Sequence, residues 1–201
     1  MMRLLGRKSS GNVQKVVWLL EERGIEYRRE DYGRQFGNTQ DPAYRKLNPT
    51  GKVPTLVDGD AVVWESNTIL RYLANTRGDT TLYPADPVAR SQVERWMDWQ
   101  LAALNGPYLD IFREAKKPAA ERSPALGKFA DALAAELLLL DGALAGREWL
   151  AGEGLSLADI CLGPIVHRCL AFPINLPALD NLRAWHQRYA GRPAFQTAIA
   201  E

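Results

Sequence analysis

Residues 48–66 read NPTGKVPTLVDGDAVVWES, and this stretch decides the fold of the first half of the chain. Val53–Val57 and Ala61–Trp64 are rich in β-branched and apolar residues, which favour strands. The intervening Asp58-Gly59-Asp60 is a hairpin turn signal, because aspartate and glycine tolerate the backbone conformations that tight turns need. The stretch therefore predicts a β-hairpin. Glu65 to Thr76 then changes to helical spacing, with Ile69, Leu70 and Leu73 on one side.

The residues before this hairpin alternate between short strands and helices. Apolar residues recur at helical spacing after a Ser-Ser-Gly break and stop at Gly24, a residue suited to end a helix. Strands are expected at Arg3–Gly6 and Glu26–Asp31, a loop at GRQFGNTQDP, and one or two helical turns at Pro42–Leu47. The order β-α-β-α-β-β-α predicts a small mixed sheet with helices on its faces.

The residues after the hairpin domain are predicted to be helical. GDTTLYPADP is rich in turn formers, so residues 78–88 are assigned as a linker. Few helix breakers interrupt the segments that follow, which are 88–114, 125–144, 157–170 and 179–189. We therefore expect an α/β domain over residues 1–77 and an all-α helical domain over 89–201.

Composition excludes several classes of protein. The 201 residues are 46% apolar and 24% charged, with a net charge of +1, so neither nucleic acid nor an acidic membrane is an expected partner. No apolar run approaches the ~20 residues of a membrane span, and MMRLLGRKSSG lacks the apolar core of a signal peptide. Cys161 and Cys169 form no spacing motif, and His167 and His186 stand alone, so we expect inert thiols, structural histidines, no metal and a cytoplasmic location.

Four stretches, in this order and at this spacing, resemble the cytosolic glutathione transferases, especially the bacterial theta-, delta- and nu-like group. They are SSGNVQKVVWLLEERGI (9–25), NPTGKVPTLVDGD (48–60), WESNTILRYLA (64–74) and LAGEGLSLADI (150–160). The resemblance covers nearly the whole chain. It implies a thioredoxin-like first domain, an all-helical bundle as second domain, a homodimer, and glutathione as co-substrate without a further cofactor.

The resemblance also implies residues that hold glutathione. A cis proline is expected at Pro54, with Val53 pairing with the ligand through its backbone as an edge strand would. Ser66 is expected to bind the γ-glutamyl carboxylate at a helix start, and Glu65 its ammonium group. On residue type alone, Glu65 and Ser66 would be read as helix-capping residues. Lys52 is a candidate for the glycyl carboxylate, and Gln40 for a further contact.

The start of the first helix is the expected catalytic position. A free thiol has a pKa of about 8.5, and a hydroxyl or amide donor at a helix N-terminus stabilises its anion. Counting back from Gly24, the family's catalytic serine or threonine corresponds to Ser10, with Asn12 as a second donor and Ser9 as a competitor. Ser and Asn are also common helix caps, so a purely structural role stays open. The stretch contains no tyrosine, so the classes of the family that use a catalytic tyrosine are not expected. It also contains no cysteine, which argues against a mixed-disulfide mechanism.

The second domain offers weaker signals. Tyr108, Phe112 and Arg113 are candidates for the pocket of the electrophile, and Asp98 for a contact with a partner subunit's glutathione. An aromatic stripe at helical spacing is nevertheless more often core. Ser156-Leu157-Ala158-Asp159 is a capping-box pattern before an apolar run, for which we expect a role in folding.

The expected reaction is attack of the glutathione thiolate on small hydrophobic electrophiles, a detoxification chemistry. Three alternatives stay open at this stage. The same fold could support glutathione-dependent disulfide or peroxide reduction or an isomerisation, could serve as a non-catalytic glutathione-binding protein, or could sequester hydrophobic compounds.

Overall fold

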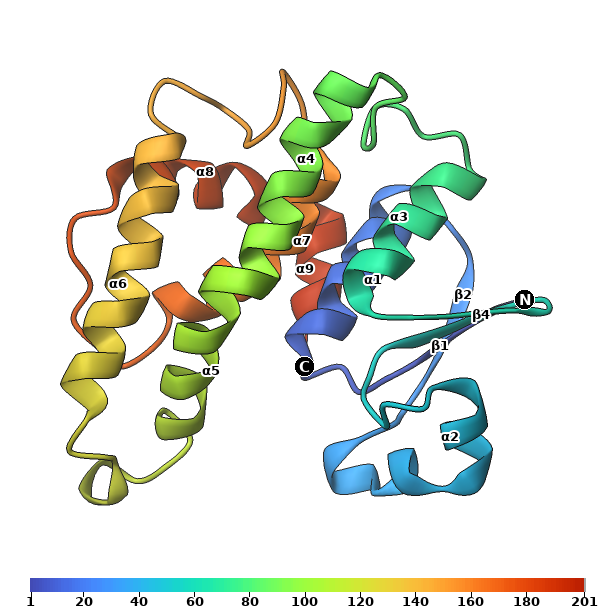
Figure 1. Ribbon diagram of the computed structural model, residues 1–201, viewed down its shortest axis with the longest axis horizontal. Helices are drawn as coiled ribbons and strands as arrows, with labels where there is room; N and C mark the ends of the chain where they lie inside the picture. Colours follow the sequence, from blue (N-terminus) through green and yellow to red (C-terminus); the bar gives the residue numbers. More distant parts are fainter. Residues whose placement is uncertain (201) are drawn as a thin grey trace. The chain divides into compact units, whose positions relative to one another are not determined.

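The computed structural model describes residues 1–200, which divide into two compact units. The first unit comprises Met1–Tyr83 together with the C-terminal segment from Ala190, and the second comprises Pro84–Tyr189. Figure 1 follows the chain through its helices and strands. The α/β and all-α parts expected from the sequence are both present.

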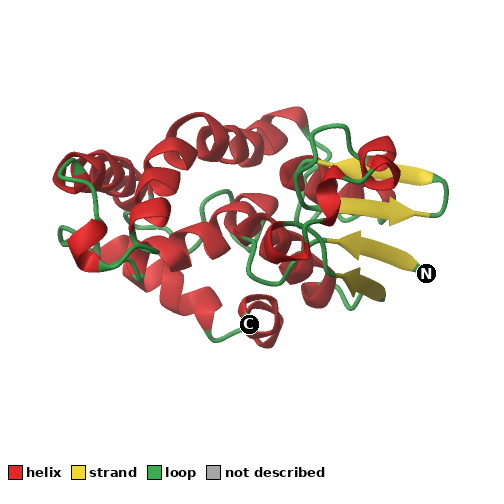
Figure 2. Cartoon of the chain, turned by 90° about the horizontal axis from the view of Figure 1, so that it is seen from below, coloured by secondary structure: helices red, strands yellow, loops and turns green. Residues whose placement is uncertain are grey.

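The first unit is built on a four-stranded sheet with the order β2-β1-β3-β4, which Figure 2 shows as one layer. β1 is parallel to β2 and antiparallel to β3, and β4 is antiparallel to β3, so the sheet is mixed as predicted. The strands are β1 (Met2–Leu5), β2 (Tyr27–Glu30), β3 (Thr55–Asp58) and β4 (Ala61–Trp64). The helices α1 (Gly11–Glu22) and α2 (Pro42–Leu47) lie between strands in the chain, and α3 (Ser66–Thr76) follows β4.

The local signals of this unit act as the sequence predicts. Gly24 has a φ of 59° just after α1, a conformation that glycine adopts without a steric penalty. The apolar side of α1 is fully buried and includes Val13, Val16 and Leu20. One difference is that β3 begins at Thr55, so Val53 lies in the loop before the strand and not within it.

A C-terminal helix completes the first unit. α9 (Pro193–Ile199) lies against α1, where the Phe195 ring meets Trp18 edge to face at 4.9 Å between centroids. Arg192, the residue before α9, forms a forked ion pair with Glu22 at the end of α1. The sequence assigns these residues to the helical domain, whereas their packing places them with the α/β unit.

The second unit is helical throughout its regular structure. Its helices are α4 (Pro87–Trp99), α5 (Asn105–Glu114), α6 (Leu126–Ala143), α7 (Leu157–Leu170) and α8 (Asp180–Ala190), the last residue of which belongs to the first unit. The sequence predicts one helix over 88–114, but residues Gln100–Leu104 form a π segment between α4 and α5. Pro107 provides the physical reason, since it lacks an N–H and its ring crowds the preceding turn.

The capping box at the start of α7 is confirmed as a structural element. The Asp159 carboxylate is fully buried and accepts hydrogen bonds from the Ser156 hydroxyl, from the Ser156 and Leu150 N–H groups, and from Trp185 Nε1. Burial raises the pKa of Asp159, and these bonds oppose that effect. The segment therefore serves folding, because the four donors satisfy a buried carboxylate that would otherwise be costly.

Within residues 1–200, none of the helices combines the length and the apolar character that a membrane crossing requires.

Candidate functional site

The register of the sheet brings the expected glutathione-binding segments to one end of the first unit. Thr55 at the start of β3 pairs with Leu5 on one side and with Trp64 on the other, and Leu5 also pairs with Glu30. The segments next to these four residues in the chain therefore lie at the same end of the sheet, three of them leaving a strand and one leading into β3. They are 6–12, 31–41, 52–54 and 65–66, and they carry all seven residues that the sequence assigns to glutathione and its thiol.

Gly6 lets two of these segments approach closely. A Cβ placed on Gly6 would lie 2.5 Å from a methyl group of Val13 and 3.4 Å from the Cβ of Val53. Any larger residue would therefore separate the first turn of α1 from the loop before β3. This close approach places the start of α1 beside Val53.

Val53 has the backbone that a peptide ligand can pair with. The Val53-Pro54 bond is cis, as the resemblance implies. Among residues 1–200, no backbone hydrogen bond engages the N–H or the C=O of Val53. Both groups are thus available to an extended ligand in the manner of an added strand.

A buried polar network holds the loop on which Val53 lies. The Tyr44 hydroxyl donates to the Lys52 carbonyl at 2.5 Å, and Asn48 Nδ2 donates to the same carbonyl at 3.0 Å and to Thr55 Oγ1 at 3.0 Å. Tyr44 and Thr55 are joined at 2.9 Å, and all three side chains are almost fully buried. Sequence analysis missed this network. The signal was Asn48 in NPTG, whose Oδ1 accepts from the Thr50 N–H in an Asx turn.

Ser10 occupies the N-cap position of α1, but its hydroxyl does not cap the helix. Its backbone is extended (φ −91°, ψ 119°), its carbonyl accepts from the Gln14 N–H, and its side chain makes no capping hydrogen bond. The hydroxyl has no hydrogen-bond partner in the part of the chain that the structure describes. Asn12 follows in the first turn and is half-buried. The capping role that competed with catalysis for Ser10 is therefore absent.

The start of α3 has a similar arrangement. Ser66 is the first helical residue, so its N–H is one of the donors that no helical carbonyl satisfies. Glu65 precedes it with φ 68° and ψ 118°, a conformation that non-glycine residues rarely adopt, and its carboxylate does not cap the helix. An N–H, a hydroxyl and a carboxylate thus lie together where the γ-glutamyl end of glutathione is expected.

Lys52 and Gln40 lie on the outer side of this end of the sheet. Both side chains are exposed, and Gln40 ends a short 3₁₀ segment, Asn38–Gln40. A Cβ placed on Gly51 would lie 3.0 Å from Gln40 Nε2, so the two loops that carry Lys52 and Gln40 adjoin. Their contacts with glutathione stay predictions of the sequence.

In the second unit, the candidate electrophile residues form part of an aromatic cluster. The Tyr108 ring stacks on Phe112 at 5.6 Å between centroids, and Phe172 lies 5.8 Å from Tyr108 and 6.5 Å from Phe112. Phe172 follows α7 and was not singled out in the sequence. Nothing in its local pattern distinguishes it from an ordinary loop residue.

The cationic side chains that contact the aromatic cluster are those of Lys116 and Arg168, whereas the sequence suggests Arg113. Lys116 Nζ lies 4.1 Å from the centre of the Phe112 ring and Arg168 Cζ lies 5.8 Å from it, both within cation–π range. The Arg113 side chain is 66% exposed and pairs with Asp110 at 3.2 Å. The role of Arg113 in polarising an acceptor stays a prediction of the sequence.

The remaining titratable residues have no arrangement that would hold a metal. Over residues 1–200, no group of three or more His, Cys, Asp or Glu side chains is placed to bind a metal ion. Cys161 and Cys169 are buried free thiols, as expected, and burial raises the pKa of Cys169.

Comparison with known proteins gives consistent results. Residues 2–75 match the N-terminal domain of glutathione S-transferase, and residues 104–193 match its C-terminal domain. The chain is 35% identical to the glutathione S-transferase GstB of Escherichia coli over 206 residues, covering 99% of this chain and 98% of that protein. It is 31% identical to glutathione S-transferase 3 of Zea mays, covering 99% and 93%.

A solved structure extends the likeness to three dimensions. The theta-class glutathione S-transferase of Xanthomonas axonopodis pv. citri, crystallised with glutathione bound, superposes with a TM-score of 0.94 at 39% identity, covering 100% of this chain and 97% of that one. Both domains, the full-length sequence likeness and the shared fold lead to one conclusion: this chain belongs to the glutathione S-transferase family.

Proposed function

We propose that this protein is a glutathione transferase in which Ser10 stabilises the thiolate of bound glutathione for attack on small hydrophobic electrophiles. Glutathione lies at the end of the sheet where the four segments lie. Its cysteinyl unit pairs with the Val53 backbone, and its γ-glutamyl carboxylate and ammonium groups meet Ser66 and Glu65. Lys52 and Gln40 contact the ligand from the adjoining loops.

One observation carries this proposal. The Ser10 hydroxyl and the Val53 N–H and C=O lie at the same end of the sheet. Among residues 1–200, none of the three groups has a hydrogen-bond partner. Backbone polar groups and helix-start hydroxyls are normally satisfied within the protein. Hydrogen-bond donors and acceptors that lie close together without protein partners therefore indicate a ligand that supplies the missing hydrogen bonds.

The chemistry requires an anionic sulfur. Lowering a thiol pKa from about 8.5 by ~2 units requires roughly 2.7 kcal/mol of preferential stabilisation of the anion. The Ser10 hydroxyl and the N-terminal dipole of α1 both favour negative charge at that place, with the Asn12 amide as a second donor. The thiolate then forms a bond to the electrophilic carbon, and the leaving group departs with its electron pair.

Replacement of Ser10 by Ala tests the catalytic assignment. We expect kcat/KM for conjugation of glutathione to a chlorodinitrobenzene to fall about 100-fold, as when one oxyanion-stabilising donor is lost. The pKa of the bound thiol, followed by ultraviolet absorbance of the thiolate against pH, should rise towards its value in water. The Kd for glutathione should change little, because Ser10 is proposed to act on the sulfur alone.

Ser9→Ala is the matched control, since Ser9 is one residue earlier and is not the N-cap. A larger loss of activity in Ser9→Ala than in Ser10→Ala would contradict the assignment. If neither variant changes the thiol pKa, the thiolate is stabilised elsewhere. A parallel assay of disulfide-bonded glutathione reduction separates conjugation from reductase activity.

The second unit is proposed to supply the wall that contacts the electrophile, through Tyr108, Phe112 and the neighbouring Phe172. The homodimer and the cytoplasmic location expected from the sequence belong to the same proposal.

A further inference from the structure

Arg7 begins the turn that carries the proposed thiolate donor. The Arg7 carbonyl accepts a hydrogen bond from the Ser10 N–H at 3.2 Å. Lys8 and Ser9 occupy the central positions of this turn, and the first and last Cα atoms of a β-turn lie within about 7 Å of each other. The Arg7 N–H donates to the Tyr32 carbonyl at 3.2 Å, which fixes the turn to the segment after β2. The backbone of Arg7 therefore holds Ser10 in place.

The guanidinium of the half-buried Arg7 lies beside Val53. The point that a Cβ of Gly33 would occupy is 2.9 Å from Arg7 Nη1 and 3.4 Å from a methyl group of Val53. Gly33 has a φ of 86°, a conformation that favours glycine. A side chain at this position would need the space that the guanidinium takes. The loop after β2 is thus built to admit a cation next to the residue proposed to pair with glutathione.

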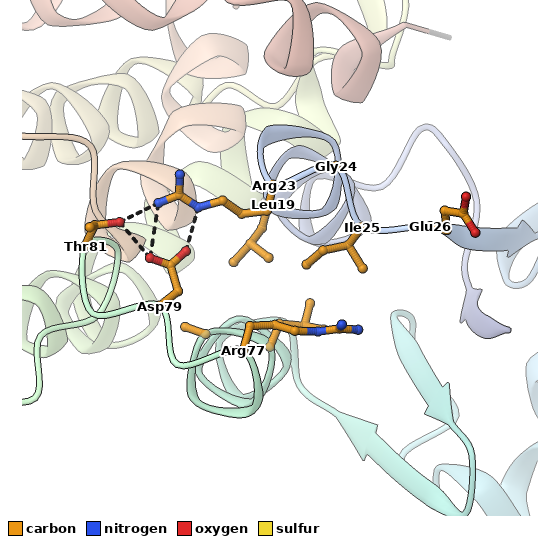
Figure 3. A pocket seen from close by; sticks show the side chains of 10 residues that line it. Leu19, Arg23, Gly24, Ile25, Glu26, Arg77, Asp79 and Thr81 are labelled. Atoms are coloured by element: carbon orange, nitrogen blue, oxygen red, sulfur yellow. Dashed lines mark hydrogen bonds and ion pairs between the residues drawn. The ribbon is translucent and has the colours of Figure 1, made fainter.

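Arg23, at the other end of α1, shows the ordinary structural role of an arginine in this unit. Its guanidinium donates to Asp79 Oδ2 at 2.6 Å and to Thr81 Oγ1 at 2.7 Å (Figure 3). Asp79 neutralises this cation, and the pair ties α1 to the chain that follows α3. The surroundings of Arg7 differ in kind, because they include a glycine backbone and the backbone proposed to bind the ligand.

We propose that the Arg7 guanidinium stabilises the thiolate of bound glutathione as a second group beside the Ser10 hydroxyl, an inference that rests on the proposed transferase function. The sulfur is placed by Val53 through the backbone of the cysteinyl unit and by Ser10 through its hydroxyl, and Arg7 adjoins both residues. Arginine keeps its positive charge over the pH range of enzyme activity. A positive charge within about 4–6 Å favours the ionised form of an acid. The thiol proton leaves to water, and Arg7 itself exchanges no proton.

The glycyl carboxylate is the other anion of glutathione expected near these loops, and Lys52 is the cation proposed for it. The two possible targets of Arg7 have different consequences. A cation that acts on the sulfur changes the pKa of the thiol and has little effect on a glutathione whose sulfur carries a methyl group. A cation that acts on the carboxylate changes the affinity for both ligands and leaves the thiol pKa as it is.

Titration of the bound thiol by ultraviolet absorbance of the thiolate tests the proposal. We expect Arg7→Gln to raise the thiol pKa by about one unit, the lower end of the effect of a nearby opposite charge. Arg7→Lys keeps the cation and should recover most of this shift. Lys8→Gln is the matched control, because it removes an equal charge from the next residue, which is exposed and screened by solvent, and its thiol pKa should equal that of the wild type.

The dependence of the rate on pH separates this effect from a structural one. The kcat/KM of Arg7→Gln for conjugation should be about tenfold lower than that of the wild type below the thiol pKa of both proteins, since one pKa unit is a tenfold change in thiolate. The difference should disappear above about pH 9, where the thiol is ionised in both. A distorted site would lose activity equally at every pH. The Kd for S-methylglutathione should stay within about twofold, because one charge acts on a sulfur that this ligand cannot ionise.

Three results would overturn the inference. They are an unchanged thiol pKa in Arg7→Gln, an equal shift in Lys8→Gln, and a loss of affinity for S-methylglutathione as large as that for glutathione. Arg7→Met is a second neutral variant and should show the same rise in pKa if the charge alone matters. Absence of glutathione binding by the wild type would contradict the transferase proposal itself, whereas a shift in Ser10→Ala without one in Arg7→Gln would contradict only the role of Arg7.

Discussion

At the scale of a single residue, Glu65 combines a proposed role in glutathione binding with a backbone conformation that is unfavourable for a non-glycine residue. Its φ of 68° lies in the region that favours glycine, and such residues cost of order 1 kcal/mol or more in stability. Its carboxylate makes no capping contact that would offset this cost. The carboxylate of Glu65 does not stabilise α3, so the strained backbone is not kept for helix capping. Binding of the ammonium group of a ligand would explain why a glutamate occupies this position.

Substitution of Glu65 by Gly and by Ala separates strain from binding. Ala normally stabilises a protein relative to Gly, but here we expect Glu65→Gly to be more stable than Glu65→Ala by about 1 kcal/mol, because only glycine adopts this φ without penalty. Urea unfolding measures the difference. Both variants should bind glutathione about tenfold more weakly, through loss of the contact with the ammonium group.

Thr68→Ala and Thr68→Gly provide the reference pair for this comparison, since Thr68 is exposed and lies inside α3. There the usual order should hold, with Ala more stable than Gly by ~1 kcal/mol. If Glu65→Ala proves more stable than Glu65→Gly, the left-handed conformation of Glu65 is not a source of strain.

At the scale of elements, α9 is the part of the chain whose role is least evident from its own sequence. It has seven residues, and a helix of that length is not stable alone in water. Its fully buried Phe195 packs against Trp18 in the middle of α1, and Arg192 pairs with Glu22. α9 therefore supports the helix whose first residues are proposed to stabilise the thiolate.

Truncation of Phe195 to Ala should destabilise the chain by about 3 kcal/mol, the usual cost of removing a buried aromatic side chain. The Trp18 indole should become more exposed in native protein, which acrylamide quenching of fluorescence would report. Thr197→Ala on the exposed side of α9 should cost less than about 0.5 kcal/mol. Equal effects of the two substitutions would show that α9 does not pack as described.

At the scale of the whole molecule, the dependence of stability on pH should reveal a half-buried histidine pair. His167 Nδ1 and His186 Nε2 of the second unit lie 3.0 Å apart, and their rings stack. Burial, together with His167 and Arg183, lowers the pKa of His186 to about 4, and burial, together with Arg168, lowers that of His167. Tyr189, which His186 meets edge to face, stays uncharged because its pKa is raised.

The sign of the effect follows from these directions. An unfolded histidine takes up a proton near pH 6.5, whereas folded His186 resists protonation down to about pH 4, so the unfolded state binds more protons in between. Stability is complete above about pH 6.5 and falls towards pH 4, by about 1–2 kcal/mol after allowance for the partial exposure of the ring. Urea midpoints at several pH values should show this fall, and His186→Gln should remove much of it.

The sequence predicts much of the fold at the level of single elements. β4 and α7 have the bounds expected for them, the order of elements in the first unit is as predicted, and Gly24 ends α1. These features depend on local periodicity and on helix-end and turn residues, which act over a few positions of the chain. The helix expected over 88–114 runs without a break from Pro87 to Glu114, but the local pattern did not predict the π geometry of Gln100–Leu104, which we attribute to Pro107.

What the sequence determined by itself is therefore the set of elements and the chain positions of the candidate site residues. Only the tertiary structure decided that the segments bearing Ser10, Val53 and Ser66 lie at one end of the sheet, that Asn48 and Tyr44 hold the loop of Val53, and that α9 packs on α1. The reason is physical: strand register and core packing depend on complementarity between residues far apart in the chain, which no local pattern records.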